Sequence, residues 1–156
     1  MTLGFKTKIN DKPTYFVEKI LAGLHGEKGF QGFKLSNLYS HDLDYLETAK
    51  PKLHTIRYDD KDRWKIGNKI HFVIGNRTKK RFQFAQVLKV KSIQKIQIKN
   101  VFNDRHSILI DDIILSKKQI ETLALNDGFN SVDEFWDYFT GTDADAKIIH
   151  WTNLRY

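Results

Sequence analysis

The 156-residue sequence predicts an α+β fold, in which a small, curled and mostly antiparallel β-barrel is flanked by helices. Three observations lead to this prediction. A helical pattern of apolar residues covers residues 14–23, a two-residue hydrophobic period dominates residues 53–114, and two helix-start signals follow it. A closing strand is expected at residues 146–151. Because no repeat or linker-like segment interrupts this order, we expect one domain over residues 1–156.

The first expected helix is followed by the least regular part of the chain. Pro13 stands just before the helix, and Gly23 offers a left-handed stop at its end. Residues 24–51 are interpreted as an insertion whose aromatic side chains anchor an ordered flap over a site. The glycines of this segment leave a phosphate-binding loop as an alternative, although they lack the Gly-x-Gly-x-x-Gly spacing.

The middle of the chain alternates apolar and polar residues, as strands with one buried face do. A turn is expected at Gly75 and Asn76, between two strands of a largely antiparallel sheet. The expected strands are, in chain order, residues 69–74, 82–90, 93–98 and 108–110.

Two capping-box patterns predict helices in the last third of the chain. Ser116 and Ser131 each stand three residues before a glutamine or glutamate, so that hydroxyl and side chain can together satisfy the first free amides of a helix. The first of these helices is expected to end at Asp127 and Gly128. The aromatic side chains of the second helix, and Trp151 of the closing strand, are expected in the core.

The net charge of +7 is concentrated in one part of the sequence. Residues 61–105 carry 13 Lys and Arg against 2 Asp and Glu, whereas residues 106–156 carry 4 against 9. Such a basic block favours RNA as a partner, with Lys79, Lys80 and Arg81 as candidate phosphate contacts. The alternative is that these cations are only the solvated faces of strands.

Composition argues against several other kinds of site. There is no cysteine, no membrane-length apolar run and no signal-peptide pattern, so a cytoplasmic protein without a membrane partner is expected. The six histidines contain no pair at helical ligand spacing, and no Gly-x-Ser-x-Gly elbow occurs. We therefore expect neither a metal nor a cofactor, and the oligomeric state stays open.

One short segment concentrates the reactive groups of the chain. Lys52, His54, Thr55 and Arg57 place an amine, an imidazole, a hydroxyl and a guanidinium within six residues. Together they can bind an anion or activate a nucleophile, or they can simply decorate a solvated strand. On a regular strand Lys52 and Thr55 would point to opposite faces. They can converge only if Lys52 precedes the strand, as Pro51 suggests, or if a bulge intervenes.

Arg63 and Trp64 follow this segment and are candidates for the same pocket, together with His54 and Arg57. Trp64 either stacks on a base or closes the end of the barrel. Arg57 either pairs with a neighbouring aspartate for structural reasons or holds a phosphate or carbonyl oxygen through its planar fork.

This layout and its motifs resemble the ASCH domain of the PUA-like superfamily. The matching pieces are the helix ending at Gly23, the Lys52-x-x-Thr55-Ile56-Arg57 string, the Trp64-Lys65-x-Gly67 turn, and Asp127-Gly128-Phe129 before the Ser131 helix. They cover most of the chain apart from residues 24–51. The resemblance implies a small curled β-barrel with flanking helices and recognition of RNA or a nucleoside.

Within that family, the Lys52 to Arg57 string is most similar to small bacterial amidohydrolases that deacetylate acetylcytidine. The resemblance implies that Thr55 is the nucleophile, Lys52 its activating base and a late carboxylate the third member. Asp127 is the nearest match to the glutamate of that family, one methylene shorter. The insertion at residues 24–51 is a second departure, because those enzymes have almost nothing there.

Three functions therefore stay open: an RNA- or nucleoside-recognising module, an amidohydrolase acting on acetylcytidine or a related N-acylated base, and a protein-interaction module that uses the acidic last third. The arrangement of Lys52, Thr55, Arg57 and Asp127 discriminates between them. Convergence on one concave pocket favours the enzyme, and a groove open along the basic strands favours RNA.

Overall fold

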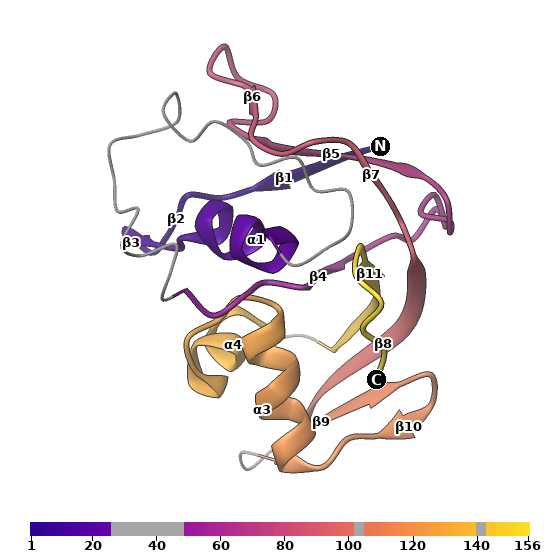
Figure 1. The fold of residues 1–156 in the computed structure, drawn as a ribbon. Coiled ribbons are helices and arrows are strands. Elements are labelled where there is room, and N and C mark those ends of the chain that lie inside the picture. Colours follow the sequence, from indigo (N-terminus) through magenta and orange to yellow (C-terminus); the bar gives the residue numbers. More distant parts are fainter. Residues whose placement is uncertain (26–48, 102–104, 140–142) are drawn as a thin grey trace.

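The computed structural model describes residues 1–25, 49–101, 105–139 and 143–156, and has an α+β architecture (Figure 1). Within these residues it contains three helices and mostly antiparallel sheets, which confirms the predicted class. No helix in these ranges is both long and apolar enough to cross a membrane. The predicted flap lies almost wholly at residues 26–48, outside the described residues.

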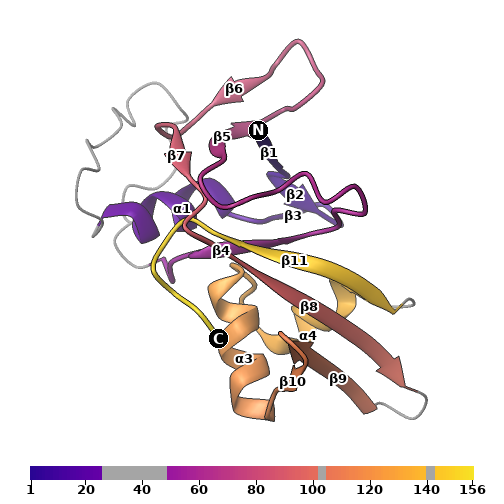
Figure 2. The same cartoon turned by 90° about the vertical axis from the view of Figure 1, so that its right-hand side faces the viewer.

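The larger sheet has five strands, and each neighbouring pair is antiparallel. In spatial order they are β10 (Ile113–Ile114), β9 (Arg105–Ile110), β8 (Ser92–Val101), β11 (Ala144–His150) and β4 (His54–Arg57). Figure 2 shows β11 running between β4 and β8. The strand that carries the reactive segment is thus at an edge of the described sheet, where β11 is its one neighbour among the strands that the structure describes.

The second sheet is built on β5 (Lys69–Ile74), which pairs with β1 (Thr2–Phe5) in parallel and with β6 (Phe82–Gln83) and β7 (Leu88–Lys89) in antiparallel orientation. The sequence did not predict β1. Only Leu3 and Phe5 of its four residues are buried, and two alternating apolar positions are too few to reveal a period. A short hairpin, β2 (Lys8–Ile9) and β3 (Lys12–Pro13), follows β1.

The single long strand predicted over residues 82–90 is wrong, because the chain there makes two short strands. Ile74 pairs with Phe82 and Ile70 with Leu88, so four steps along β5 are matched by six along the opposite segment. The two additional residues form a bulge, which interrupts the ladder and bends the chain. Apolar alternation does not report such an insertion, since Phe84 is still buried.

The three helices in the described ranges are α1 (Phe16–His25), α3 (Lys117–Asn126) and α4 (Val132–Tyr138). Ser116 forms the predicted capping box with Gln119, whereas Ser131 caps α4 but Glu134 bonds the amide of Asn130 instead of that of Ser131. Figure 1 shows α1 between β1 and β4, with α3 and α4 on the other side of β4.

Strand β11 lies between two parts of the core, because its neighbouring side chains point alternately into one part and the other. Ile148 packs with the residues of α3, α4 and the larger sheet, whereas Ile149 and Trp151 pack with α1 and the second sheet. Both faces of β11 are therefore buried from Ile148 to His150, whereas Asp145 near its start is exposed. The core position predicted for Trp151 is confirmed, since it is fully buried among aromatic side chains.

The predicted helix stop at Gly23 is wrong, because α1 continues through it to His25. Gly23 serves a different purpose. A Cβ atom at this position would lie 2.9 Å from the carbonyl oxygen of Lys52, closer than real Cβ contacts. The amide of Lys52 also donates a hydrogen bond to the carbonyl of Lys19 at 2.9 Å. Gly23 thus allows the segment before β4 to lie directly on α1.

We expect Gly23→Ala to lower the free energy of unfolding by about 1–3 kcal/mol, because the two backbones must move apart. The free energy of unfolding should fall even though alanine stabilises a helix by about 1 kcal/mol relative to glycine. Urea denaturation measures it. Ala22→Gly, one position earlier, is the matched control for helix propensity alone. A Gly23→Ala protein more stable than wild type would contradict the close contact.

Candidate functional site

The reactive segment is arranged by where β4 begins. The strand starts at His54, so Lys52 precedes it and is not bound to the alternation of strand side chains. Leu53 donates its amide to the carbonyl of Asn126 at 2.8 Å, which ties the segment to the end of α3. Within the strand, Thr55 and Arg57 share one face. Lys52 and Thr55 are therefore free to face the same space.

A cavity of about 130 Å³ lies where β1, β4, α1 and the connection from α3 to α4 meet. Lys52, Thr55, Arg57 and Asp127 all line it. Much of the remaining wall is aromatic: Phe5, Phe16, Phe129, Tyr138 and Phe139. The structure thus gathers an amine, a hydroxyl, a guanidinium and a carboxylate around a small space with apolar walls.

Lys52 and Asp127 form a buried ion pair. Lys52 Nζ donates to Asp127 Oδ1 at 2.7 Å and to the backbone carbonyl of the same residue, and lies 4.8 Å from the centre of the Phe16 ring. Burial lowers the pKa of Lys52 to about 8, although the charge of Asp127 opposes the shift. A useful fraction of the amine is therefore neutral near physiological pH.

Asp127 is held ionised against the cost of its burial. Burial alone would raise its pKa, but the Lys52 ammonium, with His54 adding to its effect, brings the pKa of Asp127 below its ordinary value. The following residue, Gly128, has φ +90°, and a Cβ there would lie 3.0 Å from Lys52 Cδ. Only glycine combines this backbone conformation with enough space for the lysine chain.

A second buried lysine supports the same loop. Lys19 of α1 donates from Nζ to the carbonyl of Gly128 at 2.7 Å and to Asn130 Oδ1 at 2.8 Å. Its burial lowers its pKa, with Glu134 opposing the shift. The connection from α3 to α4 is thus fixed from α1 by Lys19 and from the segment before β4 by Lys52.

Thr55 and Arg57 each have a polar side-chain group without a hydrogen-bond partner among the described residues. The Thr55 side chain is buried, and its hydroxyl makes no hydrogen bond within the described part of the chain. Arg57 Nη2 donates to the carbonyl of Gly4 at 2.8 Å, and the guanidinium lies 5.3 Å from the centre of the Phe5 ring. Its Nε is buried without a partner among the described residues. A buried donor of this kind is suited to a ligand oxygen.

The structural alternative for Arg57, an ion pair with a nearby aspartate, is not what the described residues show. Arg57 instead links the edge strands of the two sheets, because it extends from β4 to the backbone of β1. Burial lowers its pKa, yet a guanidinium remains charged at any physiological pH. The cavity therefore holds a fixed positive charge that no carboxylate of the described residues neutralises by direct contact.

His54 does not line the cavity and lies behind Asp127. Its Nε2 is 2.7 Å from the Tyr156 hydroxyl, and its Nδ1 is 3.5 Å from Asp127 Oδ1. Asn126 Nδ2 donates to the Tyr156 oxygen at 3.0 Å, so the phenol donates its own proton to Nε2. The proton of His54 is then on Nδ1, facing the carboxylate. Burial lowers the pKa of His54, which keeps the ring neutral.

No local pattern in the sequence points to the residues that complete this arrangement. Tyr156 is the last residue of the chain, and Phe5 and Tyr138 lie far from the motif in sequence. The aromatic content of the chain was the only signal for the cavity wall, and it does not distinguish a wall from a core. His150 lies near His54, with 5.3 Å between the ring centres and 58° between the ring planes, and neither of its ring nitrogens has a partner among the described residues.

The other predicted binding residues lie elsewhere. Trp64 is 5% exposed and packs in the core with α1, while the Arg63 side chain is 64% exposed. Neither lines the cavity. Lys79, Lys80 and Arg81 are exposed in the connection between β5 and β6, and they also lie outside the cavity wall.

Comparisons of the chain with models of protein families, with curated proteins and with solved structures gave no match. The chemistry of the site has to be judged from its own geometry.

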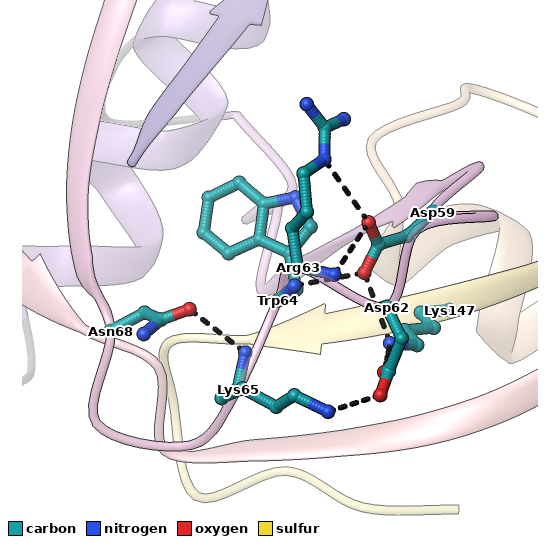
Figure 3. A network of polar contacts seen from close by, with 7 residues as sticks. All are labelled: Asp59, Asp62, Arg63, Trp64, Lys65, Asn68 and Lys147. Atoms are coloured by element: carbon teal, nitrogen blue, oxygen red, sulfur yellow. Dashed lines mark hydrogen bonds and ion pairs between the residues drawn. The ribbon is translucent and has the colours of Figure 1, made fainter.

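Figure 3 shows a second polar network, which positions the chain after β4. Asp59 accepts hydrogen bonds from the amides of Arg63 at 3.0 Å and Trp64 at 2.8 Å, and from Lys147 Nζ of β11 at 3.0 Å. Burial would raise the pKa of Asp59, but these donors lower it to about 2. Asp62 also pairs with Lys147. This network is structural, since none of its members lines the cavity.

We expect Asp59→Asn to lower the free energy of unfolding by about 1–3 kcal/mol at neutral pH, because an amide cannot accept from all three donors. The pKa of Asp59 is depressed in the folded state, so its stabilising effect is present above the ordinary value near 4 and disappears as the pH falls through about 2.

Denaturation of both proteins from neutral pH down to about pH 3 tests this expectation. The difference in free energy of unfolding between wild type and Asp59→Asn should become smaller as the solution becomes acidic. Asp60→Asn is the matched control, because Asp60 is exposed and makes no polar contact within the described residues. A gap that widens on acidification would refute the assignment.

Proposed function

We propose that the protein is an amidohydrolase that removes an acyl group from the exocyclic nitrogen of a nucleobase, as the acetylcytidine amidohydrolases do. Thr55 is the nucleophile and Lys52 its base. The observation that carries the proposal is that two groups line one small cavity: a hydroxyl with no hydrogen bond to the described residues, and a buried amine with a pKa of about 8. That the two sheets together are the curled barrel of an ASCH domain belongs to the same proposal.

The first step is the attack of Thr55 Oγ1 on the acyl carbon. A threonine hydroxyl is a weak nucleophile until a base takes its proton, and a lysine can be that base only when neutral. Burial supplies the neutral fraction of Lys52. The Lys52 ammonium donates two of its three N–H bonds to Asp127. The third position on the nitrogen is therefore left for the Thr55 hydroxyl.

The negative charge of the tetrahedral intermediate needs a donor that is already in place. Arg57 is two residues from Thr55 on the same face of β4, and its Nε has no partner among the described residues. Its Nη2 is fixed by Gly4, so little reorganisation is needed when charge develops. We assign the oxyanion to this guanidinium.

The intermediate then collapses with cleavage of the carbon–nitrogen bond. The Lys52 ammonium returns its proton to the leaving nitrogen, which departs as the free exocyclic amine of the base. Thr55 is left as an ester. Water attacks this ester with Lys52 again as base, and releases the carboxylic acid and the threonine hydroxyl.

The alternative is a module that recognises RNA or a nucleoside without cleaving it. Such a module could use the same aromatic walls and the charge of Arg57. It has no need of a buried amine of lowered pKa in the same cavity as a hydroxyl that the described residues leave without a hydrogen bond, and burying the amine costs desolvation energy. The buried Lys52 therefore favours the enzyme.

We expect the wild-type protein to deacetylate acetylcytidine, and Thr55→Ala to lower kcat/KM by at least about 10³-fold. The ultraviolet change on deacylation measures the reaction. Thr55→Ser, which retains a hydroxyl, is the matched control and should keep part of the activity. An inert wild type, or a Thr55→Ala protein as active as wild type, would exclude Thr55 as nucleophile for this substrate.

We expect kcat/KM to rise with pH up to about 8 and then level off, because Lys52 acts only after losing its proton. Below that point each pH unit should cost about tenfold in rate, since the neutral fraction falls tenfold. Rates between about pH 6 and 9, corrected for the uncatalysed reaction, measure the profile. Thr55→Ser should show the same inflection. A rate that falls as the pH rises would contradict the role of Lys52.

A further inference from the structure

The second sheet carries a basic face outside the cavity. From residue 63 to residue 103 the chain contains 11 Lys and Arg and no Asp or Glu. The basic face consists of the six exposed cations that β5, β6, β7 and their connections present: Lys69, Arg77, Lys79, Lys80, Arg81 and Lys89. Figures 1 and 2 show the connection between β5 and β6 extending from the body of the molecule.

Some exposed cations elsewhere in the molecule form ion pairs with nearby carboxylates. Lys65 pairs with Asp62, Lys95 with Asp112 and Arg155 with Asp111. Within the described residues, no member of the basic face forms an ion pair. The charge of this face is therefore available to a partner.

The basic face contains two like charges whose repulsion destabilises the folded protein. Lys69 and Lys89 are directly opposite each other on β5 and β7, and both are exposed. Like charges in that position repel. A bound polyanion would remove this cost, whereas nothing on the described protein does so.

The connection between β5 and β6 has a defined shape. Thr78 donates from its hydroxyl to the carbonyl of Gly75 at 2.7 Å and accepts from the amide of Lys80 at 3.1 Å. Gly75 has φ +58°, and a Cβ there would meet the Lys80 carbonyl at 2.7 Å. The four cations from Arg77 to Arg81 are thus presented on a preorganised turn.

This turn begins beside the cavity. Gly4 lines the cavity, and a Cβ at Gly4 would lie 3.1 Å from Cβ of Asn76, the residue before Arg77. Lys6 also lines the cavity and is exposed. Positive charge therefore extends from the cavity wall onto the basic face.

The size of the cavity limits how much of a substrate it can enclose. A volume of about 130 Å³ is below the roughly 300–1,000 Å³ of pockets that enclose a whole small ligand. It can take an acyl group and the edge of a base, while the rest of the substrate stays outside. The surface that this remainder would meet is basic.

We propose that the acylated base is presented as part of a single-stranded RNA, whose phosphates lie along the basic face while the base enters the cavity. This inference rests on the proposed function for the role of the cavity. Only a single strand can offer an unstacked base without first opening a duplex. The phosphate contacts make binding sequence-independent and steeply dependent on salt.

The test is fluorescence anisotropy of a labelled oligocytidine RNA of about 12 nucleotides with the full chain, between about 50 and 200 mM salt. Lys79→Gln/Arg81→Gln should weaken binding about tenfold, and the salt slope should fall by about 1.4 for two lost single-strand contacts. The strand variant Lys69→Gln/Lys89→Gln should weaken RNA binding to the same extent. This result would show that the loss does not come from a local change in the shape of the turn.

Lys117→Gln/Lys118→Gln is the matched control, because it removes two exposed charges from α3, at the other end of the molecule from β6 (Figure 1). It should leave binding unchanged. Equal losses in the control and in the two test variants would overturn the proposal. So would the absence of RNA binding at about 50 mM salt.

Two further outcomes are informative. Binding to phosphatidylserine vesicles without binding to the RNA would overturn the proposal, since the basic face would then be a membrane surface. Hydrolysis of free acetylcytidine separates the two claims: its absence with RNA binding intact refutes the proposed function, whereas its presence without RNA binding refutes only this inference.

Discussion

The buried ion pair between Lys52 and Asp127 is the interaction on which the rest of the site depends. It joins the segment before β4 to the end of α3, 75 residues further along the chain. Burying two charges is costly unless each is fully hydrogen-bonded. The surroundings meet most of this requirement: Asp127 offers Lys52 both a carboxylate and a carbonyl oxygen, which use two of the three ammonium donors, and Gly23 and Gly128 leave room for the segment and the side chain.

The same pair connects stability with reactivity. Desolvation makes Lys52 easier to deprotonate, while Asp127 makes it harder, and the balance is a pKa of about 8. A lysine without the carboxylate would be an uncompensated buried charge, and an exposed lysine would remain protonated at neutral pH. His54 and Tyr156 support the balance from behind, because their hydrogen bonds leave a proton facing Asp127.

The molecule separates its two kinds of positive charge. Inside the cavity, Lys52 and Arg57 are few, buried and fixed by specific partners. On the second sheet the cations are numerous, exposed and without ion pairs in the described part of the chain. Buried charges suit a defined chemical step, since their geometry is fixed, whereas exposed ones suit a long flexible polyanion. The parallel pairing of β1 with β5 brings the two regions next to each other.

The sequence by itself determined the α+β class, the mostly antiparallel sheet, the capped helices and the cluster of reactive groups from Lys52 to Arg57, because these follow from local periods and neighbouring residue types. Only the tertiary structure decided which of them share a space. Asp127 faces Lys52 and Thr55 lines the same cavity because β4 starts after Lys52, whereas Trp64 goes to the core. The short β1, the bulge opposite β5 and the contact of Tyr156 with His54 join distant parts of the chain, and no local pattern encodes such contacts.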